Sequence, residues 1–392
     1  MVSNTLKELV FVSEIRSPNI NSTSTHLMTE SILTGFKENN LKVTFLAICE
    51  CESDKNIIEN YYSKIVDRII ILPSFYSKKP GKYTKLFSML KNNFFNYKYK
   101  KILCDLCTDI PVPDIIVSHT PSYEAVCYAK TLKYFYPKAP YYQYWSDPMA
   151  LSGILPDNYS LKRFPFYYLE SKAYKYADQI IFGTKTLYYF NSVLYKKHIN
   201  KMRYVDVPYL DKADIASKIT RPQNEFIYAG NYYSSIRNIL PLYNAFNKLG
   251  NNFHLTIFGD SDLALDNTEN VTVNNRISAK ELENIEQSFK NSVCLLNHSC
   301  IQIPGKTFYQ IDTDQNIIVI TDGAYKSEII DYLNSYGRFI ICDNNEISIA
   351  NALVKTSQHT EYRCPQEIKE KYSPKNVAAD LLGFVSHLND SI

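Results

Sequence analysis

The residue types best placed to do chemistry lie in the last third of the chain, in a turn built on proline and glycine. Residues 303–310 read Ile-Pro-Gly-Lys-Thr-Phe-Tyr-Gln, and the apolar run 317–320 follows them. We expect a turn at Pro304 and Gly305, a short helix from Lys306, and a strand over 317–320. Backbone N–H groups, the positive end of a helix dipole and the Lys306 ammonium would then face one place, which suits a phosphate diester. An ordinary loop-to-helix turn with a surface lysine is the alternative.

This turn belongs to a regular alternation of strands and helices. The apolar runs of the second half predict strands at 226–231, 254–258, 271–273, 293–296, 317–320 and 338–342. We expect Arg237 to lie at the start of the helix that follows the first of these strands. Because the loops at the carboxyl ends of parallel strands share one edge of a sheet, we expect Arg237 and Lys306 to converge there on a pyrophosphate.

The first half opens with the same pattern, a strand at 8–13, a helix at 27–39 and a strand at 42–49. Two later strands end in polar residues: His119 follows one of them, and Asp147 follows the next. Both side chains are therefore expected at one edge of the sheet, as candidate catalytic groups. A structural histidine and a helix N-cap are the alternatives for the two residues.

Length and composition limit the class of protein. The chain has 392 residues, which is long for one core and predicts two domains, 1–210 and 222–374, with a boundary in the polar stretch after residue 210. We also expect a C-terminal helix within 375–392, with packing against the first domain as one arrangement. A net charge of +3 argues against a general nucleic-acid binder.

Cysteine usage and the absence of long apolar runs predict a cytoplasmic protein. The nine cysteines lie mainly in apolar stretches, which indicates reduced, buried thiols. Cys104 and Cys107 have metal-ligand spacing, but no second pair follows them, so buried thiols are the preferred interpretation. The chain start lacks a basic signal-like region, and no run approaches the ~18 apolar residues that span a bilayer.

The segment 76–101 combines lysines with aromatic residues. It holds eight lysines, many aromatic and aliphatic residues, and no acidic residue. That composition suits an anionic membrane surface, where each basic residue contributes about 1 kcal/mol. A helix with its aromatic stripe in the core and a site for single-stranded nucleic acid remain alternatives, the last being the least favoured.

With these residues in place, the chain resembles the GT-B-fold glycosyltransferases, nearest the retaining family 4 type enzymes of bacterial surface polysaccharide synthesis. The resemblance rests on Tyr228-Ala229-Gly230-Asn231 with Arg237 downstream, on Phe258-Gly259-Asp260, and on the Pro-Gly-Lys turn with its following strand. It implies two Rossmann-like doubly wound domains that face a cleft, with the donor bound by the second domain.

The resemblance also implies roles for residues. The donor-binding residues would be Gly230, Asn231, Arg237, Arg276, Ile277, Pro304, Gly305, Lys306, Thr307, Tyr309 and Gln310. In that family a Gly-Arg turn and a lysine hold the donor pyrophosphate; here Asn231 departs from the pattern and Arg237 keeps the charge. Tyr309 falls where the family has a ribose-binding glutamate, and His119 would lie near the transferred sugar.

The implied function is transfer of a sugar from a UDP- or GDP-linked donor to a lipid-linked or growing glycan acceptor, without an obligatory metal and at the inner face of the membrane. A nucleotide-sugar epimerase of the same fold and a catalytically inactive binding subunit are the alternatives. A dinucleotide oxidoreductase is disfavoured, because no G-x-G-x-x-G follows the first strand.

Overall fold

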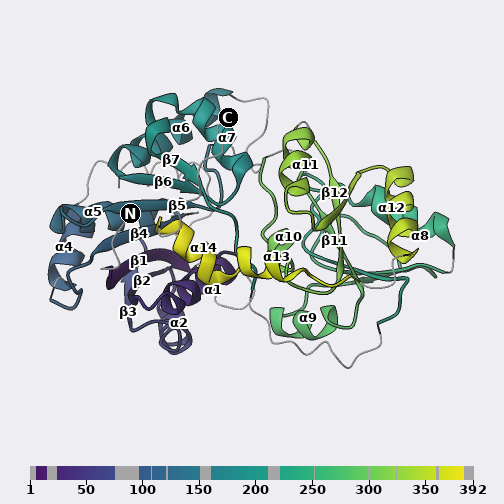
Figure 1. Cartoon of the computed structure of the whole chain (residues 1–392), viewed down its shortest axis with the longest axis horizontal. Helices are drawn as coiled ribbons and strands as arrows, with labels where there is room; N and C mark the ends of the chain where they lie inside the picture. Colours follow the sequence, from purple (N-terminus) through teal and green to yellow (C-terminus); the bar gives the residue numbers. More distant parts are fainter. Residues whose placement is uncertain are drawn as a thin grey trace. The chain divides into compact units, whose positions relative to one another are not determined.

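The protein has two compact units, each built on a parallel sheet, shown in Figure 1. The computed structural model describes residues 6–15, 24–75, 97–106, 108–120, 122–150, 160–210, 221–250, 252–298, 301–323, 325–358 and 362–383. Unit 1 comprises Met1–Ala150, Asn158–Pro208 and Ser373–Ile392, and unit 2 comprises Leu151–Asp157 and Tyr209–Tyr372. The prediction about the segment 76–101 falls largely outside the described residues, which resume at Tyr97.

In the described part of unit 1 the sheet has seven strands in the order β3-β2-β1-β4-β5-β6-β7, all paired in parallel. The strands are β1 Glu8–Ile15, β2 Lys42–Cys49, β3 Arg68–Pro73, β4 Ile115–Thr120, β5 Tyr141–Trp145, β6 Gln179–Phe182 and β7 Met202–Tyr204. The helices are α1 Ser24–Glu38, α2 Lys55–Tyr62, α4 Tyr97–Leu106, α5 Tyr123–Phe135, α6 Ser160–Tyr176, α7 Lys185–Leu194 and α14 Pro374–Leu381, with short 3₁₀ turns η2 Glu52–Asp54 and η3 Lys196–Lys201. Strands β1, β2 and β4 are buried almost throughout, because helices cover both faces of a doubly wound sheet.

In the described part of unit 2 the sheet has six strands in the order β10-β9-β8-β11-β12-β13, again all parallel. The strands are β8 Glu225–Ala229, β9 His254–Phe258, β10 Val271–Asn274, β11 Asn291–Leu295, β12 Asn316–Thr321 and β13 Phe339–Asp343. The helices are α8 Leu240–Leu249, α9 Ala279–Glu286, α10 Lys306–Tyr309, α11 Lys326–Asn334, α12 Glu346–Gln358 and α13 Gln366–Lys371. The predicted class, α/β with two Rossmann-like doubly wound domains, is confirmed by these two sheets.

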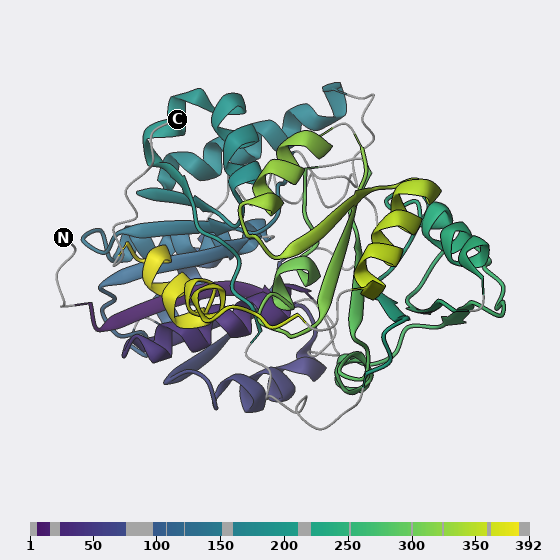
Figure 2. The same cartoon turned by 45° about the vertical axis from the view of Figure 1, so that its right-hand side comes forward.

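The last described helix, α14, packs on α1 although more than 300 residues separate them in the chain, and Figures 1 and 2 show the two helices side by side. Gly35 makes the close approach possible, because a Cβ atom there would lie 2.1 Å from the carbonyl oxygen of Pro374. Asn39 donates to the Lys375 carbonyl at 2.7 Å, and Arg203 donates to the carbonyls of Asp380 and Leu381.

Two local expectations differ from the structure. The residues 170–177 predict a helix that starts at Glu170, but helix α6 already begins at Ser160 and has Pro165 inside it. Leu169 and Ala173 are buried in the core, and this packing outweighs the cost of the proline. Cys104 is exposed on α4, so the prediction of a buried thiol is wrong for this residue. The other cysteines in the described ranges are buried or half-buried.

Candidate functional site

The candidate site lies where the strand order of unit 2 changes direction. Strands β8 and β11 are neighbours, and the chain continues outward from β8 through β9 and β10, and from β11 through β12 and β13. The loops after Ala229 and Leu295 therefore leave in opposite directions, which is the position at the carboxyl edge where sheets of this kind have their ligand crevice.

Two glycines set the shape of this edge. A Cβ atom on Gly259 would lie 2.1 Å from the carbonyl oxygen of Gly230, so the turns after β8 and β9 are in direct backbone contact. The Gly230 amide donates to Phe258 at 2.9 Å, and the Asp260 amide donates to the Asn231 side chain at 3.1 Å. The sequence-predicted Gly230 and Asn231 thus hold the two turns together.

Arg237 joins the loops on the two sides of the crevice. Its Nε donates to Oδ1 of Asn297 at 2.9 Å, and its Nη1 donates to the Asn231 carbonyl at 2.7 Å. The amide of His298 donates to the Ile236 carbonyl at 3.0 Å, which adds a backbone link across the same gap. Two acceptors therefore orient the guanidinium, and the remaining N–H groups of its planar fork suit a phosphate.

Lys306 lies at the same end of β8. Its Nζ donates to the carbonyl of Ala229 at 3.2 Å and forms an ion pair with Glu286, whose side chain is only 8% exposed. The sequence analysis missed Glu286. The sequence does contain a pattern that locates this residue. The capping box at Ser278 sets the start of α9, and Glu286 follows Leu282 by four residues, which places both on the same face of the helix.

The two cations lie at the same end of β8. They bind carbonyl oxygens two residues apart, on Ala229 and Asn231, and both act on the buried thiol of Cys294. Burial raises the pKa of Cys294 to about 11, while the positive charges of Lys306 and Arg237 oppose that rise. The end of β8 is thus the centre of a positive site beside one buried carboxylate.

The Pro-Gly-Lys turn is less open than expected. The amides of Thr307, Phe308 and Tyr309 donate to the carbonyls of Pro304 and Gly305 at 2.9–3.1 Å. These three amides therefore form hydrogen bonds within the turn and are not available to a phosphate. Helix α10 has only four residues, which makes its dipole a small contribution. The Lys306 ammonium and the Arg237 guanidinium, more than backbone amides, supply the positive charge.

Three residues expected to contact the donor lie inside unit 2. Thr307 is fully buried, and Tyr309 and Gln310 are 4% and 2% exposed. Gln310 accepts a hydrogen bond from the Ser292 hydroxyl at 2.8 Å, because that polar residue on β11 is buried and needs a partner. In this structure Gln310 stabilises the sheet.

The loop with Arg276 and Ile277 follows the edge strand β10. Arg276 is exposed and Ile277 is half-buried, and strand β9 lies between β10 and β8 in the sheet.

In unit 1, His119 is the last residue but one of β4, at the carboxyl edge, and is completely buried. Its Nδ1 lies 3.1 Å from the Thr29 hydroxyl, and its Nε2 lies 3.1 Å from the Ser146 hydroxyl. Ser146 donates its proton to the Thr120 carbonyl at 2.8 Å, so Nε2 carries the ring proton and Nδ1 accepts. Burial lowers the pKa of His119 to about 3, which keeps the ring neutral. His119 was expected to face a bound sugar, but in the structure its ring connects Thr29 on α1 with Ser146 after β5.

Asp147 follows β5 directly and is half-buried in the turn after Trp145. The neighbouring Ser146 links this turn to β4 through His119 and Thr120. The structure therefore brings the two predicted residues of unit 1 to adjacent strand ends, as expected from the sheet order.

Two buried carboxyl groups in unit 1 have raised pKa values. Glu124 accepts from the Ser74 hydroxyl at 2.5 Å and the Phe75 amide at 2.6 Å, and Tyr99 donates to it at 3.3 Å. Burial raises the pKa of Glu124 to about 7, and burial raises the pKa of Glu170 to about 7. Sequence periodicity gives no signal for either, since each is an ordinary polar position on a helix.

No family model matches the sequence, and no curated protein matches it. Solved structures do. The chain is similar to sucrose-phosphate synthase from Thermosynechococcus elongatus, with 10% identity, a TM-score of 0.59, and coverage of 96% of this chain and 94% of that one. Similarity to UDP-GlcNAc 2-epimerase from Neisseria meningitidis bound to UDP-GlcNAc has 12% identity, a TM-score of 0.55, and coverage of 96% and 99%. For the Anabaena protein HepE in complex with UDP and glucose the values are 10%, 0.52, and 96% of each chain.

The chain has the GT-B fold. At 10–12% identity, these similarities establish the architecture alone, because one fold supports many reactions. Among the described residues, no helix is long and apolar enough to cross a bilayer. The same residues contain no group of three or more His, Cys, Asp or Glu side chains arranged to hold a metal ion.

Proposed function

We propose that the protein is a glycosyltransferase that uses a nucleoside diphosphate sugar as donor and binds its pyrophosphate at the crevice of unit 2. The observation that carries the proposal is the convergence of Arg237 and Lys306 on the carboxyl end of β8. Glycosyl transfer releases a nucleoside diphosphate, and fixed positive groups stabilise the charge that develops on this leaving group. Similar structures contain UDP with glucose or UDP-GlcNAc, which supports this class of donor.

We infer a UDP- or GDP-linked sugar, a glycan or lipid-linked acceptor, retention of configuration, and a place at the inner face of the membrane in surface polysaccharide synthesis. In this proposal Arg237 and Lys306 supply the positive charge at the phosphates, and no obligatory metal is included. In this proposal His119 holds the ends of β4 and β5 in place on the acceptor side, and Asp147 is the candidate contact to acceptor or sugar.

Binding of UDP and GDP by calorimetry tests the site. We expect Arg237→Ala and Lys306→Ala each to weaken binding by about 1–3 kcal/mol, roughly 5- to 150-fold, because each removes a charge-assisted contact. Lys248→Ala is the matched control: it removes a lysine that is also paired with a glutamate in unit 2, Glu346, but on α8. If all three variants bound UDP and GDP as tightly as the wild type, the crevice would not be the site that holds the diphosphate.

An epimerase is the second candidate, because UDP-GlcNAc 2-epimerases share the fold. Incubation with nucleotide sugars separates the two reactions. A transferase releases nucleoside diphosphate faster when an acceptor is added, whereas an epimerase changes the sugar without an acceptor. Tight binding with neither reaction would identify a binding subunit.

A further inference from the structure

Helix α9 ends on a buried carboxylate that lies beside the cations of unit 2. Glu286 is the last residue of this helix, and its carboxylate forms an ion pair with the Lys306 ammonium. Two effects work against an ionised carboxylate at this place. The C-terminal end of a helix carries partial negative charge, and burial removes the side chain from water. The contact with Lys306 offsets both effects, so the two residues form one charged unit.

The end of α9 is held in place by side chains from other segments. Gln315, just before β12, is buried and donates from its Nε2 to the Glu286 carbonyl at 2.8 Å. Arg221 donates to the carbonyl of the next residue, Gln287, also at 2.8 Å. Contacts that involve no ligand therefore fix the carboxylate of Glu286 beside Lys306.

The Lys306 ammonium has to be shared when a phosphate binds. Of its three N–H groups, one donates to the Ala229 carbonyl at 3.2 Å and one to Glu286, and the third can donate to a ligand. The acceptors of Arg237 described above are neutral amide oxygens. A phosphate at these two cations therefore competes with the carboxylate of Glu286 for Lys306.

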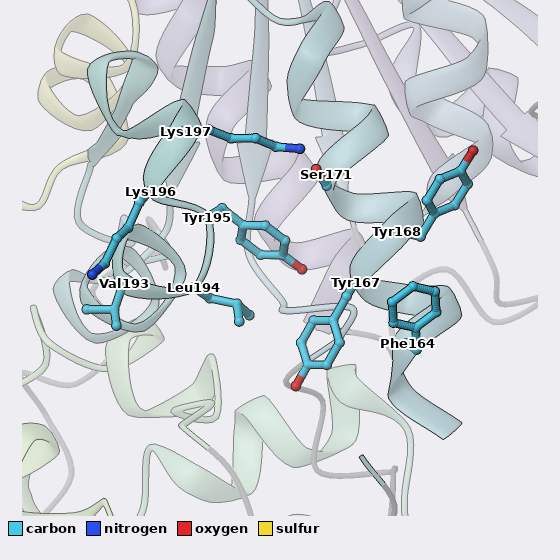
Figure 3. Close-up of a pocket in the computed structure, with 9 residues that line it drawn as sticks. All are labelled: Phe164, Tyr167, Tyr168, Ser171, Val193, Leu194, Tyr195, Lys196 and Lys197. Carbon is cyan, nitrogen blue, oxygen red and sulfur yellow. The ribbon is translucent and has the colours of Figure 1, made fainter. Parts of the chain in front are cut away.

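Convergence of two cations is not a general feature of this protein. In unit 1 a pocket of about 500 Å³ lies between α6 and the segment formed by α7 and η3, and two lysines line it. Figure 3 shows that Lys196 and Lys197 extend to opposite sides of Tyr195, so their ammonium groups do not face one anion. These lysines therefore serve as comparison cations for the site in unit 2.

The charges at the end of β8 bear on which of two related ligands binds more tightly. Arg237 and Lys306 contribute two positive charges and Glu286 one negative charge, which gives +1 for the three groups. Two cations alone bind the most negative ligand most tightly. In glycosyl transfer that ligand is the product, because the terminal phosphate keeps the electron pair of the broken bond to the sugar.

The extra charge of the product would lie close to Glu286. The second ionisation of a terminal phosphate has a pKa of about 6, so above that pH the nucleoside diphosphate carries about one more negative charge than the nucleotide sugar. One bridging oxygen joins the two phosphates, so this charge is near Glu286 whichever phosphate Lys306 binds. A buried carboxylate is screened less than an exposed one, and its repulsion acts more on the product than on the donor.

We propose that Glu286 is a specificity-determining residue of the donor site, which lowers the affinity for the nucleoside diphosphate product more than the affinity for the nucleotide-sugar donor. The inference rests on the proposed function, since it requires a diphosphate at Lys306. It adds to that function a means of releasing the product, because a site with two cations and no counter-charge would retain the more negative ligand.

Calorimetry at about pH 8 with two pairs of ligands tests the proposal: UDP with UDP-glucose, and GDP with GDP-mannose. Glu286→Gln removes the charge and keeps an oxygen that can accept from Lys306. We expect the ratio of dissociation constants, diphosphate over nucleotide sugar, to fall about threefold or more in this variant, because the repulsion of the product is removed. An unchanged ratio would overturn the proposal.

Three variants serve as controls. Glu286→Asp keeps a negative charge at the end of α9, so its ratio should stay near that of the wild type. Glu346→Gln removes the carboxylate of another glutamate–lysine pair of unit 2, the one with Lys248, and should not change the ratio. Lys197→Gln should leave the affinity for UDP unchanged. Equal shifts of the ratio in Glu346→Gln and Glu286→Gln would refute the assignment to Glu286.

Glu286→Ala keeps the test decisive if the glutamine variant does not fold. This substitution also removes the acceptor that orients Lys306, so both ligands are expected to bind more weakly than to Glu286→Gln. The ratio should still fall, because the charge is absent. Thermal unfolding identifies which variants are folded, and a wild-type ratio in a folded Glu286→Ala protein would contradict the proposal.

Failure of this inference is distinguishable from failure of the proposed function. If the wild type binds neither pair of ligands, the diphosphate site is absent and both proposals fall. If the wild type binds them, Arg237→Ala and Lys306→Ala weaken the binding, and the Glu286 variants leave the ratio unchanged, the donor site stands and the role of Glu286 falls.

Discussion

At the residue scale, burial decides what the titratable groups of this protein can do. His119 stands where a surface imidazole was expected, yet hydroxyl groups contact both ring nitrogens and the ring is fully buried. A buried neutral imidazole with two hydroxyl partners orients its neighbours and does not take up a proton near neutral pH. Any effect of His119 on a reaction therefore acts through Ser146 and the strand ends.

We expect the His119 ring to stay neutral with its proton on Nε2 at every pH above about 4, because burial holds its pKa near 3. Nitrogen NMR of the labelled ring checks this. The folded pKa lies below the ordinary 6.5, so this residue's contribution to stability is present above pH 6.5 and is lost as pH falls toward 3. A ring that titrates near 6.5 in the folded protein would contradict the buried position.

Glu124 is expected to give the opposite pH dependence. Its folded pKa, about 7, lies above the ordinary 4.5, so its contribution to stability is present below pH 4.5 and is lost as pH rises to 7. Relative to the wild type, Glu124→Gln should gain on the order of 3 kcal/mol in unfolding free energy across that range, at about 1.4 kcal/mol per pKa unit. Urea unfolding at several pH values measures the difference.

The matched control for this prediction is Glu59→Gln, which changes an exposed carboxyl group on α2 of the same unit. Its unfolding free energy should follow that of the wild type at each pH. If Glu124→Gln and Glu59→Gln gave the same pH profile, the buried position of Glu124 would not be the source of the dependence.

At the element scale, the proposed donor site depends on how closely the turns after β8 and β9 approach each other. Gly259→Ala places a methyl group 2.1 Å from the Gly230 carbonyl oxygen, so the backbone must move. We expect a loss of stability of about 1–3 kcal/mol, as for other overpacked sites, together with weaker diphosphate binding. Thermal unfolding and calorimetry on the purified variant measure both.

The adjoining glycine provides the control. A Cβ atom on Gly230 would lie 3.5 Å from its nearest neighbours, the Arg237 Nη1 and the Tyr228 hydroxyl, which is ordinary contact. Gly230→Ala should therefore keep the stability of the wild type. Comparable destabilisation by the two substitutions would show that the turns are not as close as the structure places them.

At the scale of the whole molecule, the chain ends by returning to the unit where it began. Arg203 binds the carbonyls of Asp380 and Leu381 at the end of α14, and Gly35 lets the start of α14 rest on α1. Unit 1 therefore needs residues after Ser373 to complete its surface, although they follow all of unit 2 in the chain.

We expect Arg203→Ala to speed hydrogen exchange of the α14 amides, because the substitution removes two hydrogen bonds that hold the end of the helix. Arg221→Ala is the comparison, since Arg221 also donates to a backbone carbonyl, that of Gln287, but within unit 2. Exchange in α14 should be unchanged in the Arg221 variant. Unchanged exchange in both variants would show that the Arg203 contacts do not stabilise α14.

The sequence by itself determined the alternation of strands and helices and the places of Arg237 and Lys306 in the loops after two strands. These features depend on apolar periodicity and turn chemistry within a few residues, so they can be read locally. The order of strands then places Arg237 and Lys306 at one sheet edge, which is why their convergence could be predicted.

Only the tertiary structure decided the environment of each side chain. Lys306 meets the carbonyl of Ala229, 77 residues away, and the carboxylate of Glu286; His119 lies between Thr29 and Ser146. The burial of Gln310 beneath β11 is of the same kind. Pairings between distant segments leave no local periodicity, yet they set desolvation and hydrogen bonding, and these determine whether a polar residue can meet a ligand.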